Sequence, residues 1–122
     1  MGWFDGFPFQ SKADMEKEKR DFEKRVFPFG LEQRDHARTV LQELIPHVKS
    51  DTELLFAFIN SKDIYMKDEQ SEEGLLRARQ QMKKLRYFTE EDKDRILTLV
   101  QLDAAAPSLE NYPTAQDVLS HL

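Results

Sequence analysis

Pairs of a hydroxyl residue and an acidic residue three positions later recur along this chain, and they constrain its fold more than any other feature. Such pairs occur at Ser50/Glu53, Thr89/Asp92 and Thr114/Asp117. In a capping box the hydroxyl accepts a hydrogen bond from a backbone N–H of the first helical turn, and the acidic side chain returns to the N-cap N–H. Each pair therefore predicts the start of a helix. Ser71, with Glu73 close behind it, predicts a further start.

Apolar residues recur at helical spacing between these starts, and proline or glycine separates several of the runs. The cleanest amphipathic pattern covers residues 31–45, directly before Pro46. We predict helices over residues 12–27, 31–45, 50–66, 71–87 and 89–102, and a short one after Thr114. The fifth is apolar around most of its circumference, which indicates a central position. The predicted fold is all-α: one domain over residues 1–122, with five helices, a short C-terminal sixth and an aromatic N-terminal arm at residues 1–10.

Residues 53–67 also allow a second interpretation. The run LLFAFI, followed by NSKD and IYMK, is compatible with two strands joined by a turn. This alternative gives an α+β fold with a β-hairpin near residues 53–67. We favour the helix because the capping box at Ser50 and the presence of Ala57 are typical of helices.

Composition restricts the class of protein. The chain has no cysteine, which removes disulfides and thiolate chemistry and fits a reducing cytoplasm. Its net charge of −5 argues against broad binding to nucleic acid or to anionic membranes. No signal peptide is recognisable, and the longest apolar run, Leu54 to Ile59, is far too short to span a bilayer. We expect a cytoplasmic location and no membrane partner.

Reactive residues do not form a recognisable catalytic or metal-binding set. Glu32 and His36 are four apart and can meet on one helix, but they supply at most half a metal site. His47 follows Pro46, where we expect it to meet the terminal carbonyls of the preceding helix. We find no carboxylate alone within an apolar stretch, so no acid with a raised pKa is expected. The sequence therefore predicts a non-enzyme without metal or cofactor, with a metal or small-ligand protein built around Glu32 and His36 as an alternative.

A basic run near the middle of the chain suggests another alternative. Its cations are Arg77, Arg79, Lys83, Lys84 and Arg86, and all lie outside the apolar face of their helix. If exposed together, they could contact nucleic acid as part of a regulator. The next helix, however, begins with TEEDKD, whose acidic residues would repel phosphate. We therefore do not favour nucleic acid as a partner.

The aromatic arm is the most suggestive functional feature. It contains Trp3, Phe4, Phe7 and Phe9, and the first helix after it has only a narrow apolar stripe that includes Phe22. Aromatic surface of this size rarely stays in contact with water, so the arm must pack on its own domain or on another protein. We expect the first helix to be partly exposed. The leading hypothesis is a non-enzymatic, protein-interaction helical protein that self-associates, for example as a homodimer, with these five residues at the contact.

Overall fold

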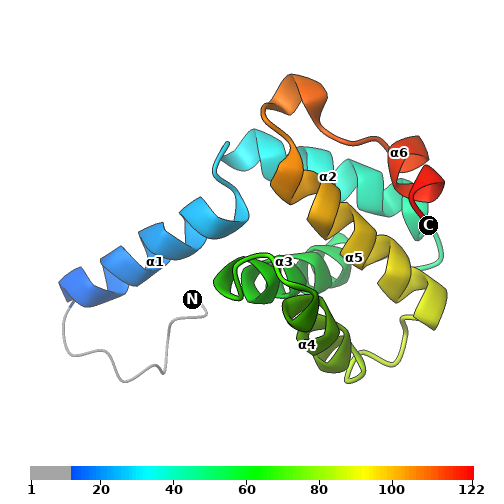
Figure 1. The fold of residues 1–122 in the computed structure, drawn as a ribbon, viewed down its shortest axis with the longest axis horizontal. Coiled ribbons are helices and arrows are strands. Elements are labelled where there is room, and N and C mark those ends of the chain that lie inside the picture. Colours follow the sequence, from blue (N-terminus) through cyan, green and yellow to red (C-terminus); the bar gives the residue numbers. More distant parts are fainter. Residues whose placement is uncertain (1–11) are drawn as a thin grey trace.

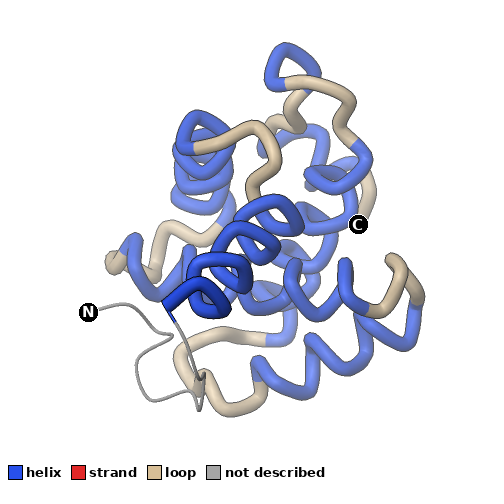
Figure 2. Tube along the Cα trace, turned by 90° about the vertical axis from the view of Figure 1, so that its left-hand side faces the viewer, coloured by secondary structure: helices blue, strands red, loops and turns tan. Residues whose placement is uncertain are grey.

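The computed structural model describes residues 12–122, and every regular element in that range is a helix (Figures 1 and 2). The elements are α1 (Lys12–Val26), α2 (Leu31–Leu44), α3 (Asp51–Lys67), α4 (Glu72–Met82), α5 (Glu90–Ala105), the 3-10 turn η1 (Leu109–Asn111) and α6 (Ala115–Ser120). The predicted all-α bundle of five helices and a short sixth is confirmed. None of the helices in this range combines the length and apolarity needed to cross a membrane.

The β-hairpin alternative at residues 53–67 is wrong, because this whole segment lies within α3. Its buried side chains follow the helical period: Leu54, Ala57, Phe58, Ser61, Lys62 and Tyr65. This spacing puts them all on one face of a helix, whereas in a strand about half of them would point to the opposite side. Burial of one continuous face therefore decides in favour of the helix.

The helix starts lie where the hydroxyl residues predicted them. Thr89 with Asp92 and Thr114 with Asp117 form complete capping boxes. Ser50 forms only half of a box: its hydroxyl accepts a hydrogen bond from the Glu53 N–H at 3.3 Å, and the reciprocal bond is absent. At the start of α4 the Ser71 hydroxyl accepts a hydrogen bond from a backbone N–H of the first helical turn. Local capping thus sets the N-termini of four helices.

One helix end differs clearly from the prediction. We expected the fourth helix to continue to about Tyr87, but α4 ends at Met82. The following residues form tight turns, in which the Leu85 N–H donates to the Met82 carbonyl at 2.9 Å. These turns bring Phe88 into the core, where it is buried. Burial of this large aromatic ring outweighs continuation of a helix that has good local propensity.

The core lies between α3 and α5, and α2, α4 and α6 pack around them. Four apolar residues of α5 are buried: Ile96, Leu97, Leu99 and Val100. The predicted central position of the fifth helix is therefore confirmed. The C-terminal α6 contributes Val118 to the same core.

Helix α1 extends away from the rest of the bundle and packs mainly on α3 (Figure 1). From residue 14 to residue 25 its side chains are exposed or half-buried, and Val26 is the first buried one. The chain then turns into α2 at Gly30, whose φ of 83° and ψ of −158° lie in a region open almost only to glycine. The expectation of a partly exposed first helix is confirmed.

Candidate functional site

A groove lies where α1 meets α2 and α3, and it contains the one predicted contact residue within the described range. The groove has a volume of about 450 Å³. Its lining residues are Phe22, Glu23, Phe27, Gly30, Leu31, Arg34 and Ile59. Phe22 is half-buried, while Leu31 is 67% exposed and the adjoining Phe29 is 41% exposed. We call this feature the α1 groove.

The other four residues of the predicted contact, Trp3, Phe4, Phe7 and Phe9, lie outside the described residues. Their participation stays a prediction. The structure adds that the helix directly after them is exposed and leads to an apolar groove that contains Phe22. A contact that involves the arm would therefore have an apolar surface available at the other end of α1.

The predicted basic residues do not all remain free. Arg77 forms an ion pair with Asp68, and Arg79 pairs with Glu90 at 2.7 Å and also with Asp94. Arg79 thus pairs with the acidic start of α5, whereas the partner of Arg77 lies at the end of α3, and both contacts neutralise part of the basic face. The remaining cations of the set are exposed and make no ion pair with any residue in the range 12–122: Lys83, Lys84 and Arg86. The ion pairs therefore reduce the positive surface on this face. Binding of nucleic acid here stays an untested hypothesis.

The Glu32 and His36 pair lies on the exposed side of α2. The His36 ring stacks on Tyr112, with 5.5 Å between the ring centroids. Within the part of the chain that the structure describes, no three histidine or acidic residues converge as a metal site. The aromatic neighbour gives His36 a packing role.

A group of polar residues that meet at Asp103 was not predicted from the sequence. Asp103 of α5 forms an ion pair with Lys62 of α3, and its Oδ1 accepts a hydrogen bond from Gln33 of α2 at 3.1 Å. Its other oxygen, Oδ2, accepts from the Tyr112 hydroxyl at 2.5 Å. We call these four residues the Asp103 cluster. Each of them comes from a different part of the chain, so the cluster ties distant segments together.

Three members of the cluster, Gln33, Lys62 and Asp103, are almost completely removed from solvent, and Tyr112 is half-buried. Lys62 is 1% exposed and Asp103 is 2% exposed. Burial lowers the pKa of Lys62 from its ordinary value, although the nearby Asp103 carboxylate opposes this shift. Burial raises the pKa of Tyr112, and the negative charge of Asp103 adds to the effect. Shielded in this way, the ammonium and carboxylate groups suit a structural role, because a substrate in solution cannot reach them.

Sequence signals for this cluster existed. Asp103 lies in the run LVQLDAAA, so our expectation that no carboxylate stands alone in an apolar stretch is wrong. Asp103 also follows Ile96 and Leu99 at helical spacing, on the buried face of α5. Lys62 similarly lies four residues after Phe58 on the buried face of α3. Two opposite charges on the core faces of two helices indicate a buried pair.

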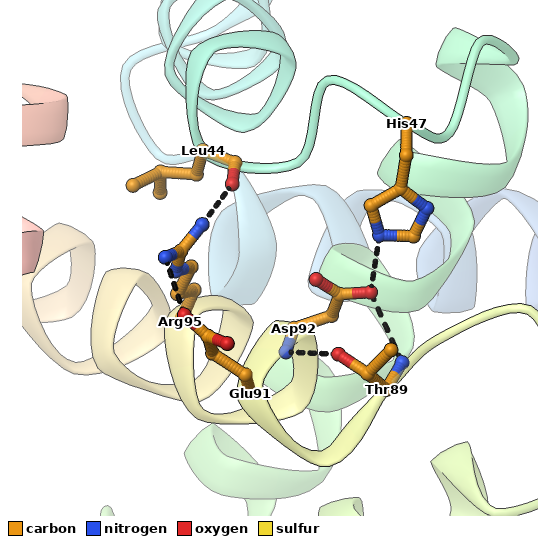
Figure 3. A network of polar contacts seen from close by, with 6 residues as sticks. All are labelled: Leu44, His47, Thr89, Glu91, Asp92 and Arg95. Carbon is orange, nitrogen blue, oxygen red and sulfur yellow. Dashed lines mark hydrogen bonds and ion pairs between the residues drawn. The ribbon is translucent and has the colours of Figure 1, made fainter.

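A second polar network connects the end of α2 with the start of α5 (Figure 3). His47 Nε2 lies 2.6 Å from Asp92 Oδ2, the same oxygen that accepts from the Thr89 N–H at 3.0 Å. Our expectation that His47 meets the terminal carbonyls of the preceding helix is wrong. Arg95 takes that role and donates to the Leu44 carbonyl at 2.6 Å. Because Asp92 is a buried acceptor, it attracts the imidazole away from the helix end.

The fold and these sites define a small all-helical bundle with a projecting first helix. No protein-family model, curated protein or solved structure matches the chain.

Proposed function

We propose that this chain is a non-enzymatic interaction protein that self-associates through its aromatic arm and the α1 groove. The observation that supports this most is the groove itself. It contains Phe22, it opens beside the exposed Leu31, and it lies at the base of a helix whose side chains face mostly water. An exposed apolar surface of this kind, close in the chain to four more large aromatic residues, is typical of an interaction site.

The available area fits a dimer. A large aromatic side chain buries about 150–250 Å². The arm has four such side chains, so each copy would contribute roughly 600–1,000 Å². Two arms together would reach the range of about 1,200–2,000 Å² that is usual for specific interfaces. In a reciprocal contact each copy offers an arm and a groove. Both arms are then buried, and the assembly closes as a dimer.

The arrangement of titratable groups also supports a binding protein. Lys62 and Asp103 form an ion pair that is shielded inside the bundle. His47 is bound to an aspartate that also caps a helix. These groups have structural partners, and this leaves the apolar surface around α1 as the better candidate for function.

Light scattering coupled to size-exclusion chromatography tests the proposal on the full chain. The variant Trp3→Ser/Phe4→Ser/Phe7→Ser/Phe9→Ser removes the arm's aromatic surface. The matched control, Phe56→Ser/Leu76→Ser, removes exposed apolar side chains from α3 and α4, away from the α1 groove. We expect the wild-type chain and the control to have the mass of a dimer and the arm variant to have the mass of a monomer. A monomeric wild-type chain at high concentration would end the self-association proposal.

A further inference from the structure

Helix α1 is connected to the bundle mainly through its last turn. Val26, its final residue, is fully buried, and its carbonyl accepts a hydrogen bond from Lys62 Nζ. Carbonyls at a helix C-terminus lack partners within the helix, so an ammonium donor satisfies one of them. Arg25 adds an ion pair to Asp63 at 2.9 Å. The direction of α1 therefore depends on a few contacts around residue 26.

The corner between α1 and α2 is held by the same cluster. The Phe29 N–H donates to Gln33 Oε1 at 2.9 Å, and Gln33 Nε2 donates to Asp103 Oδ1 at 3.1 Å. Lys62 likewise binds a backbone carbonyl of α1 on one side and Asp103 on the other. Two side chains thus connect the backbone at the end of α1 and within this corner to a single carboxylate.

The other oxygen of this carboxylate is connected to the molecular surface. Tyr112 follows η1 and donates its hydroxyl proton to Asp103 Oδ2. The ring of Tyr112 stacks on the exposed His36 and lines a surface groove of about 370 Å³ together with Glu43 and Leu109. Tyr112 therefore connects the surface of the bundle to Asp103, which in turn holds the α1 corner through Lys62 and Gln33.

From this geometry we infer that Asp103 acts as a shared anchor, so that the position of Tyr112 controls how firmly α1 is held in its direction. A buried carboxylate needs all its hydrogen-bond donors. When the Tyr112 hydroxyl is lost or displaced, Asp103 must shift to find new donors, and Lys62 and Gln33 move with it. Both of these residues hold the backbone of the α1 corner. A change in the C-terminal loop is thereby transmitted to α1.

This coupling between Tyr112 and α1 does not depend on the proposed self-association, because all of its contacts lie within one chain. It would nevertheless set the position of the α1 groove, since α1 supplies Phe22 and Glu23 to that groove. Displacement of Tyr112, for example by a molecule in the groove beside His36, would alter the surface around α1 on another side of the bundle.

The chain has no cysteine, so two labels can be introduced without background. We would label the full chain at Lys17→Cys on α1 and Gln80→Cys on α4, both exposed positions. Electron–electron double resonance then measures the distance between the labels. An excess of unlabelled chain in the sample removes distances between copies, so the outcome is independent of any dimer.

The test variant is Tyr112→Phe, which removes one oxygen atom and does not touch α1. The matched control is Tyr65→Phe, a change of the same kind at a buried tyrosine of α3. We expect one narrow distance for the wild-type chain and for the control, and a clearly broader distribution for Tyr112→Phe. The variant Lys62→Met, which removes the donor to Val26, should broaden it further.

A distance distribution for Tyr112→Phe that equals the wild-type distribution would overturn the inference. Comparison with Val118→Ala separates loosening of the α1 corner from a general loss of stability, because Val118 is a buried core residue of α6 and does not belong to the Asp103 cluster. If Val118→Ala broadens the distribution as much as Tyr112→Phe at equal loss of stability, the anchor has no special effect and the inference is likewise wrong.

Discussion

Lys62 of α3 and Asp103 of α5 form an ion pair from which water is almost completely excluded. Removal of two charges from water is costly, and their mutual attraction offsets this cost only when further hydrogen bonds satisfy both groups. Here Lys62 also binds the Val26 carbonyl, and Asp103 has Gln33 and Tyr112 as additional donors. The pair thus belongs to a network in which each member depends on the others.

Removal of one charge should therefore cost more than removal of both. We expect Asp103→Leu to lower the free energy of unfolding by about 3–5 kcal/mol, because the Lys62 ammonium stays buried without a counter-charge. The double variant Lys62→Met/Asp103→Leu should be more stable than this single variant. Gln33 and Tyr112 lose the same acceptor in both, so the difference reports the removal of the Lys62 ammonium together with its hydrogen bond to the Val26 carbonyl. Urea denaturation measures the free energy of unfolding of both variants. A double variant that is no more stable than the single one contradicts the prediction.

Tyr112 should make stability depend on alkaline pH. In the folded protein the pKa of Tyr112 is raised above its ordinary value of 10.0. Below pH 10 both the folded and unfolded states keep the phenol proton, and the stabilisation is present in full. Above this pH the unfolded state releases the proton first, so the free energy of unfolding falls as pH rises.

The variant Tyr112→Phe isolates this effect, because it lacks the ionisable group and keeps the ring. At neutral pH we expect it to be less stable than the wild-type chain by about 1–3 kcal/mol, since Asp103 loses a donor. The gap should narrow as pH rises above about 10. Lys62 titrates in both proteins, so its influence largely cancels. Denaturation curves at several pH values measure the gap, and a constant gap argues against a raised Tyr112 pKa.

The two capping boxes should differ in their contribution to stability. Asp117→Ala removes one exposed hydrogen bond, to the Thr114 N–H, at a cost of about 0.5–1.5 kcal/mol. Asp92→Ala should cost more, because the buried Asp92 also binds His47. In the Asp92→Ala background, a further His47→Ala change should have little effect, since its partner is already gone. Thermal unfolding of the wild-type chain and these three variants measures the costs, and equal losses for the two single aspartate variants would contradict the prediction.

The local parts of this fold could be predicted from the sequence. Helix starts depend on short-range hydrogen bonds, and so Thr89 with Asp92 and Thr114 with Asp117 were recognisable from their spacing alone. The buried stripe of α5 was equally visible. The early end of α4 was not predictable in this way, because it depends on where Phe88 finds space in the core.

The contacts of the Asp103 cluster, in contrast, could not be predicted from local spacing. Its members lie up to 79 positions apart, from Gln33 to Tyr112, and local spacing does not reveal which of them meet. The helical position of Asp103 still marked it as facing the core. His47 was misjudged for a related reason: proximity in the chain suggested the end of α2, whereas its acceptor lies on a helix that follows much later. Long-range polar contacts need the packed structure.

The order of the Asp103 cluster along the chain also affects synthesis. Gln33 and Lys62 leave the ribosome well before Asp103, which both of them contact. Tyr112, which binds the same carboxylate, emerges later still. Until residue 103 emerges, the nascent helices carry an amide and an ammonium group on faces that later become dry. Burial of either group without a partner is costly, so we expect α2 and α3 to close on each other only when α5 supplies Asp103.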